Sequence, residues 1–197
     1  MDARERAVRC AARYLGVRGE PRGAARAVLE AAYPMALEAA QQKHLIRRTS
    51  VCAAAGRLRI ADALEIPSLD LCRLFDGAKE GLALVITLGA APDVLVRRLM
   101  LTDPALGAAV GACASALVDE EIDRLLAARS GELAKEGIRL SPRFSPGYGD
   151  APLSCQEPLL RWLEARRIGV CLTAGGLMLP EKSVTALVAL LPKEDGI

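Results

Sequence analysis

Arg143-Phe144-Ser145-Pro146-Gly147-Tyr148-Gly149-Asp150 is the stretch that says most about this chain. It gathers a guanidinium, two aromatic rings and a Pro-Gly pair, although aromatic residues make up only 3% of the sequence. The Pro-Gly pair predicts a tight reversal, because Pro fixes its own φ and Gly accepts a positive one. Such a turn can bring Arg143 and Tyr148 together as a clamp for a small polar ligand, since Arg binds carboxylate or phosphate and Tyr adds a flat face. The alternative is a surface turn with a tucked Tyr, because Pro-Gly turns are common.

The composition predicts one soluble globular domain. The chain has 197 residues, 52% of them hydrophobic, and a net charge of +2 with both signs interspersed. No basic stripe suits nucleic-acid phosphates, so we expect no nucleic-acid partner. The longest apolar run, residues 104–118, is too short to span a bilayer, so we expect no membrane partner.

The cysteines predict free thiols rather than disulfides or metal ligands. They stand alone, without a C-x-x-C pair or a partnering His. This pattern predicts no metal site. Residues 1–6 lead into an amphipathic segment rather than an apolar signal region, so we expect a cytoplasmic protein. The six are Cys10, Cys52, Cys72, Cys113, Cys155 and Cys171.

The first third of the chain predicts helices followed by strands. Apolar spacing indicates helices over 4–15 and 22–41, and Pro34 should kink the second or break it in two. Strands are expected over 45–51 and 58–60 around a turn at Gly56. Ser68 is expected to cap a short helix that runs through Phe75.

The remainder predicts a sheet with covering helices. The run 82–88 does not alternate, so it indicates a strand buried on both faces. Asp103 should cap a long helix that begins at Pro104. Other expected elements are helices 92–101 and 155–166, a strand 138–140, and strands 168–173 and 183–191 paired with each other. The sequence therefore predicts one α+β unit over 1–197, with a helical N-terminal arm and strands in 1–60 and the core in 61–197.

Few familiar catalytic patterns are present. There is no P-loop, no G-x-S-x-G and no H-E-x-x-H, and Gly89-Ala90-Ala91 lacks the spacing of a dinucleotide loop. The lone His44 is expected to be a surface or packing residue. The acidic run from Asp119 to Asp123 is expected to be a solvated helix face. Thr173-Ala174-Gly175-Gly176 fits either a backbone approach to a ligand or a plain loop.

The R-x-x-x-G-Y pattern of Arg143, Gly147 and Tyr148 resembles the signature of the reactivation domain of cobalamin-dependent methionine synthase, which binds S-adenosylmethionine (AdoMet). The resemblance spans about residues 80–190, because further segments follow in the same order. These are Thr87–Gly89, Leu101–Pro104, Leu172–Thr173, Met178–Pro180 and Ser183–Ala186.

The resemblance implies a mainly antiparallel sheet flanked by helices and a cofactor site in the loop 143–150. Arg143 would hold a polar part of AdoMet, and the backbone near Ser145 and Gly147 would approach it. Tyr148 would stand near the methyl group as the catalytic residue. A carboxylate of the long helix, matched here by Asp119, would complete the AdoMet site.

The resemblance also implies partners. Cobalamin would be carried by a cobalamin-binding methyltransferase module, and a flavodoxin-like or other donor would supply an electron. The chain would act in trans, taking part in reactivation rather than catalysing alone. It departs from the pattern at Ala174, where a carboxylate is usual, and at Leu187-Val188-Ala189, where aromatics are usual. Two alternatives remain open: a docking module of this fold that has lost AdoMet, and an unrelated α+β protein.

Overall fold

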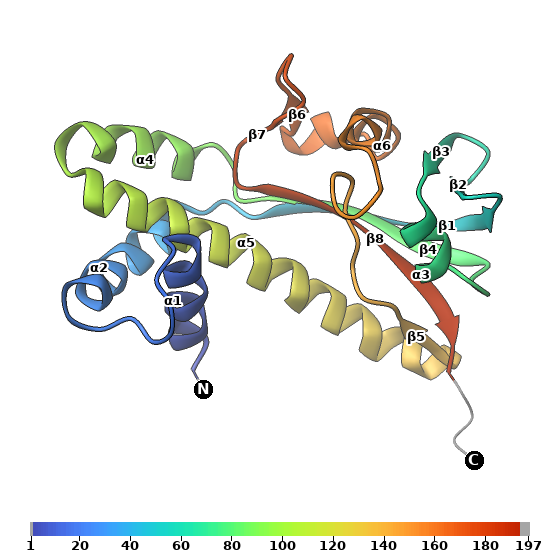
Figure 1. Cartoon of the computed structure of the whole chain (residues 1–197), viewed down its shortest axis with the longest axis horizontal. Coiled ribbons are helices and arrows are strands. Elements are labelled where there is room, and N and C mark those ends of the chain that lie inside the picture. Colours follow the sequence, from blue (N-terminus) through green and yellow to red (C-terminus); the bar gives the residue numbers. More distant parts are fainter. Residues whose placement is uncertain (1, 194–197) are drawn as a thin grey trace.

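A six-stranded sheet forms the centre of the protein in the computed structural model, which describes residues 2–193 (Figure 1). The strand order is β3-β2-β1-β4-β8-β5, and every neighbouring pair is antiparallel. The expected α+β class with a mainly antiparallel sheet flanked by helices is confirmed. The strands are β1 Lys43–Ala54, β2 Arg57–Ile60, β3 Leu64–Pro67, β4 Glu80–Thr87, β5 Ile138–Leu140 and β8 Ser183–Pro192. The short strands β6 Cys171–Leu172 and β7 Met178–Leu179 form a separate hairpin.

Helices cover both faces of the sheet. Residues of α1, α2 and α5 join one core with alternate residues of β4 and β8, and α4 packs at its edge. Residues of α3 and α6 join a second core with the intervening strand residues. The sheet therefore lies between two apolar layers, as β4 requires with nearly every residue buried. The helices are α1 Ala3–Tyr14, α2 Gly23–Ala39, α3 Leu69–Leu74, α4 Ala91–Thr102, α5 Pro104–Leu133 and α6 Gln156–Trp162.

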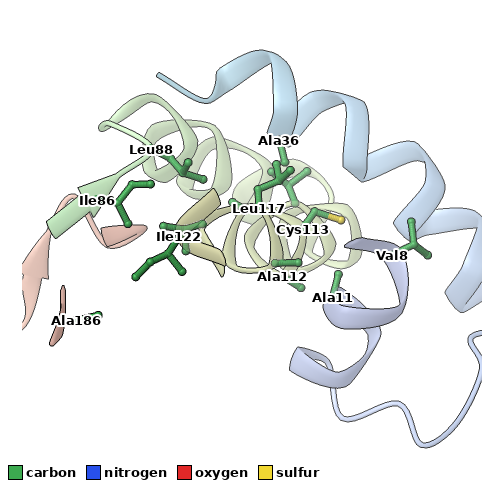
Figure 2. Packing of buried hydrophobic residues seen from close by; sticks show 14 of the residues in the cluster. Val8, Ala11, Ala36, Ile86, Leu88, Ala112, Cys113, Leu117, Ile122 and Ala186 are labelled. Atoms are coloured by element: carbon green, nitrogen blue, oxygen red, sulfur yellow. The ribbon is translucent and has the colours of Figure 1, made fainter. Parts of the chain in front are cut away.

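Small side chains let helices approach α5 closely. Figure 2 shows Ala11 of α1 beside Ala112, and Leu117 and Ile122 on the same helix in the core that Ile86 of β4 joins. At Gly107 an added Cβ would lie 2.9 Å from the backbone nitrogen of Met100 in α4. The α1 helix thus lies directly on α5, and this contact brings its last turn to the site described below.

The two predicted helix caps are confirmed. The hydroxyl of Ser68 accepts a hydrogen bond from the Leu71 N–H over 3.0 Å at the start of α3. The Asp103 carboxylate accepts one from the Leu106 N–H over 3.1 Å at the start of α5. Each cap satisfies an amide that has no partner within its helix.

The expected pairing of 168–173 with 183–191 was wrong. The first segment supplies only β6, which pairs with β7, whereas β8 inserts between β4 and β5. The reason is that β4 is buried on both faces and needs an apolar partner along its whole length. The ten apolar-rich residues of β8 supply it, whereas the short β6 cannot.

Two further expectations need correction, and a third is narrowed. Of the two outcomes expected at Pro34, the break is excluded, because α2 continues through this residue as one element. The α6 helix ends at Trp162 rather than 166, because Glu164 adopts a left-handed φ of 58°. The strand β3 was not expected. It pairs with β2, so the sheet continues across the boundary placed at residue 60.

Candidate functional site

The loop that follows β5 continues along the free edge of β8. Phe144 and Leu187 exchange two backbone hydrogen bonds, of 2.9 and 2.7 Å. The Phe144 ring packs against the core on the α6 side. Because successive side chains along an extended strand point to opposite faces, Arg143 is directed to the α5 side. This local strand pairing fixes where the guanidinium emerges.

The expected tight reversal is confirmed. The N–H of Tyr148 donates to the carbonyl of Ser145 over 3.2 Å, and Gly147 has a φ of 91°. The turn is fastened to the sheet by the hydroxyl of Ser145, which donates to the carbonyl of Thr185 in β8. Ser145 and Gly147 therefore lie in a rigid turn beside an open strand edge.

Arg143 pairs with two carboxylates of α5. Its Nη2 donates to Asp119 Oδ1 over 3.0 Å, and its Nε lies 3.1 Å from Asp123 Oδ1. The side chains of Arg143 and Asp119 are 32% and 25% exposed, respectively. The predicted cofactor residues Arg143 and Asp119 are thus in direct contact, and both remain open to a small ligand.

Tyr14, at the last turn of α1, completes this network and was not predicted from the sequence. Its hydroxyl donates to Asp119 Oδ2, on the opposite side of the carboxylate from Arg143. Burial raises the pKa of the Tyr14 phenol, and the hydrogen bond to Asp119 raises it further. The phenol stays protonated as a donor over the whole physiological range.

Tyr148 lies beside this network with its ring in solvent. Its exposed fraction is 70%, and it makes no side-chain hydrogen bond within residues 2–193. It is close enough to Tyr14 to raise the pKa of that phenol electrostatically. Within residues 2–193, Arg143 pairs with Asp119 and Asp123 and makes no hydrogen bond to Tyr148.

The acidic run on α5 is more buried than a solvated helix face. Glu121, whose side chain is 10% exposed, pairs with Arg124. Glu120 Oε1 accepts no hydrogen bond within the described chain and lies 3.8 Å from Arg6 Nε. Burial raises the pKa of Glu120. In this part of α5, Glu120 therefore has one buried carboxylate oxygen without a hydrogen-bond partner in the described chain.

A cleft of about 1090 Å³ lies elsewhere on the protein. Its walls come from α6, the turn 165–168 and the hairpin β6–β7, and include the whole Thr173–Gly176 segment. None of Arg143, Tyr148 and Asp119 lines it. Leu153 of its wall lies next to the loop, because its Cδ1 is 3.1 Å from where a Cβ on Gly147 would stand.

The remaining candidate groups show no catalytic arrangement. His44 is exposed on β1 opposite Ile86. All six cysteines are free, and Cys155 is buried with its pKa raised by that burial, as expected for an unreactive thiol. Residues 2–193 contain no cluster of His, Cys, Asp or Glu suited to a metal ion. No helix among them is both long and apolar enough to cross a membrane.

Comparison with known proteins identifies a solved structure with a similar fold. No protein-family model and no curated protein sequence matches the chain. Its structure is similar to the crystal structure of the MetH reactivation domain bound to AdoHcy, with a TM-score of 0.71 over 98% of this chain and 77% of that one. The chain has the fold of the MetH reactivation domain. The sequence identity is 14%, so the likeness concerns the fold, and the fold expected from the resemblance is confirmed.

Proposed function

We propose that this protein binds AdoMet between the loop 143–150 and α5, and serves the reductive remethylation of the cobalamin of a methionine synthase or related corrinoid methyltransferase. The observation that carries the proposal is the contact of Arg143 with Asp119 on the reactivation-domain fold. The similar structure holds AdoHcy, the thioether that AdoMet becomes when its methyl group leaves.

The charges of the site fit the amino-acid part of AdoMet. Its carboxylate matches the planar fork of Arg143, and its ammonium group matches the carboxylate of Asp119. In the described structure these two side chains satisfy each other at 3.0 Å. A zwitterionic ligand can insert by exchanging one part-exposed ion pair for two. The cost is small, because such pairs contribute about 0–1 kcal/mol.

The protein contributes position rather than covalent chemistry. When bound, AdoMet would supply an electrophilic methyl group for transfer to the reduced cobalt of a partner's cobalamin, with AdoHcy as the leaving group. The rigid turn at Ser145 and Gly147 would orient the ligand. Holding two bound groups in the reactive orientation removes a large part of the activation barrier for transfer between them. Tyr148 would border the methyl-donating side, where its exposed ring leaves room for a corrinoid to approach.

The partners follow from this chemistry. We infer that a cobalamin-binding methyltransferase module on another chain covers the Tyr148 side, and that a flavodoxin-like or other donor delivers the electron. These reactions belong to the cytoplasm. The chain takes part in them without catalysing a reaction alone.

A second function, docking on a corrinoid protein without AdoMet, is favoured by two observations. Arg143 already has two carboxylate partners, Asp119 and Asp123, and needs no ligand to satisfy its charge. The last strand, β8, also has no aromatic side chain that could contact AdoMet, since Leu187 and Ala189 are aliphatic and buried. In this case the loop would serve as a contact surface only.

Titration calorimetry with AdoMet separates the two functions. We expect wild type to bind and Arg143→Ala to lose at least about tenfold in affinity, since a charge-assisted pair contributes about 1.5–3 kcal/mol. Arg166→Ala is the matched control, because it removes an equally charged exposed residue from the wall of the large cleft. Loss of binding in Arg166→Ala instead would move the site to that cleft.

The same titration is repeated with a cobalamin-loaded methyltransferase module present. If wild type binds no AdoMet alone or with the module, while still binding the module, the docking function replaces the proposed one. Thermal unfolding of each variant checks that the fold is intact. Arg143→Ala should change stability by less than about 1 kcal/mol, because the pair is part-exposed.

A further inference from the structure

Tyr14 reaches the Asp119 carboxylate from a different element than the loop does. Its hydroxyl donates to Asp119 Oδ2 from α1, whereas Arg143 of the loop donates to Oδ1. Half of its surface, 54%, remains exposed although the hydroxyl is engaged. The hydroxyl therefore fixes the ring at the edge of the site while a large part of the ring stays free to contact a ligand.

The ring is held rigidly. Ala11 and Ala12, in the same turn of α1, have no exposed surface and belong to the core shared with α5. Figure 2 shows Ala11 packed beside Ala112. Since α1 cannot slide on α5 without losing this contact, the Tyr14 ring is preorganised before a ligand arrives.

The surroundings of the ring favour a cation. Asp119, Glu120 and Asp123 lie on this side of α5, where Arg143 and Arg6 pair with them. These three carboxylates face two guanidinium groups, so the cluster carries one negative charge in excess, which attracts a cation. An aromatic face attracts a cation through its quadrupole, most strongly where water is partly excluded.

AdoMet carries such a cation at its reactive sulfur, whereas AdoHcy, with a neutral thioether, does not. We propose that Tyr14 is a specificity-determining residue, whose ring contacts the sulfonium of AdoMet and favours AdoMet over AdoHcy. Tyr14 and Tyr148 then border the sulfonium from two elements, in place of a ring from β8. The inference rests on the proposed function, since it assumes that AdoMet binds beside Asp119.

The test compares Tyr14→Phe with Tyr14→Leu by calorimetry, using AdoMet and AdoHcy as separate ligands. Both variants lose the hydroxyl, and only the second loses the ring, so their difference reports the aromatic face alone. Relative to Tyr14→Phe, we expect Tyr14→Leu to bind AdoMet about 5- to 30-fold more weakly. AdoHcy affinity should differ between them by less than about twofold.

The outcomes separate the two claims. If wild type binds neither ligand, alone or with the cobalamin-loaded module present, the proposed function fails, and this inference fails with it. If wild type binds AdoMet but the two variants weaken AdoMet and AdoHcy equally, only the inference is overturned, and Tyr14 merely fastens α1 to α5. Circular dichroism and thermal unfolding establish that both variants keep α1 folded.

Discussion

The carboxylate of Asp150 accepts a hydrogen bond from the N–H of Leu69 over 2.7 Å, although the two residues are 81 positions apart. The same carboxylate accepts from the hydroxyl of Ser68 and the N–H of Asp70. The end of the loop that carries Arg143 and Tyr148 is thereby tied to the first turn of α3. The loop is thus anchored at both ends, by Phe144 on β8 and by Asp150 on α3.

Asp150 should make stability depend on pH in the acid range. Its hydrogen bonds, chiefly that from Ser68, lower the pKa of the folded carboxyl below its usual value. The stabilisation is therefore complete above the unfolded-state pKa of about 3.9 and is lost as the pH falls through the lower folded value. We expect Asp150→Ala to lower the urea midpoint at pH 7, with the difference from wild type shrinking by pH 3.

The control for Asp150 is Asp76→Ala, an exposed carboxylate just after α3. Its removal should leave the pH dependence of the urea midpoint as in wild type. An Asp150→Ala variant whose deficit is the same at pH 7 and pH 3 would show that the charged form of Asp150 does not anchor the loop.

Gly149→Ala should destabilise the protein and disturb the loop. Gly149 has a φ of 53°, and an added Cβ would lie 2.3 Å from Asp70 Oδ2. Asp70 must then move, although it accepts from the N–H of Asp150. Gly169→Ala is the matched control, because it has a φ of 84° with no atom within 4 Å of the added Cβ.

The backbone cost alone is about 1–2 kcal/mol for a left-handed Ala, and Gly169→Ala should show it in urea unfolding. Gly149→Ala should lose more stability than this and should also weaken AdoMet binding, which Gly169→Ala should not. Equal losses of stability in the two variants would contradict the contact with Asp70.

Local signals in the sequence predicted local structure well. Ser68 and Asp103 precede helices as side-chain caps, and the unbroken apolar run of β4 marks a central strand. These features depend on a few adjacent residues. The pairing of β8 was predicted wrongly, because it depends on which distant strand has a free apolar edge. The spacing of residues along the chain does not indicate which strand that is.

The geometry of the candidate site could be predicted only in part, and the AdoMet-binding roles of its residues stay predictions. Arg143, Gly147 and Tyr148 lie within six positions, so one turn motif indicated all three. Tyr14 and Asp119 are 105 positions apart, and their contact depends on how α1 packs on α5. The only available signal for Tyr14 was the scarcity of aromatic residues, which marks each ring as unusual without naming its partner.

The rate at which each cysteine reacts with iodoacetamide should depend on how deeply its thiol is buried. Cys52 and Cys171 are exposed, whereas Cys113 is fully buried and burial raises its pKa to about 12. Only the thiolate reacts, so at pH 8 we expect Cys113 to be alkylated at least about a hundredfold more slowly than Cys52. Peptide mass spectrometry measures each rate, and labelling in urea is the control.

Cys155 should follow Cys113 in this experiment, because it is 7% exposed and its pKa is also raised by burial. Fast labelling of Cys155 in the native protein would indicate an accessible thiolate beside the loop. It would also reopen a redox role for this residue.

Tyr14 should make stability depend on pH in the alkaline range. Burial and the hydrogen bond to Asp119 raise the pKa of the folded phenol above the unfolded value of about 10. The stabilisation is therefore complete below pH 10 and is lost as the pH rises through the folded value. We expect the urea midpoint of wild type to fall between pH 8 and pH 10.5.

Tyr14→Phe should show a smaller fall in the urea midpoint over the same interval, since the titrating phenol is gone. Some decline should persist, because burial also raises the pKa of Tyr33. Tyr33→Phe is therefore the matched control, and the double variant should be flatter than either single one. If Tyr14→Phe follows wild type throughout, the hydrogen bond to Asp119 does not form in solution. The site would then lack the contact that holds the Tyr14 ring beside Arg143.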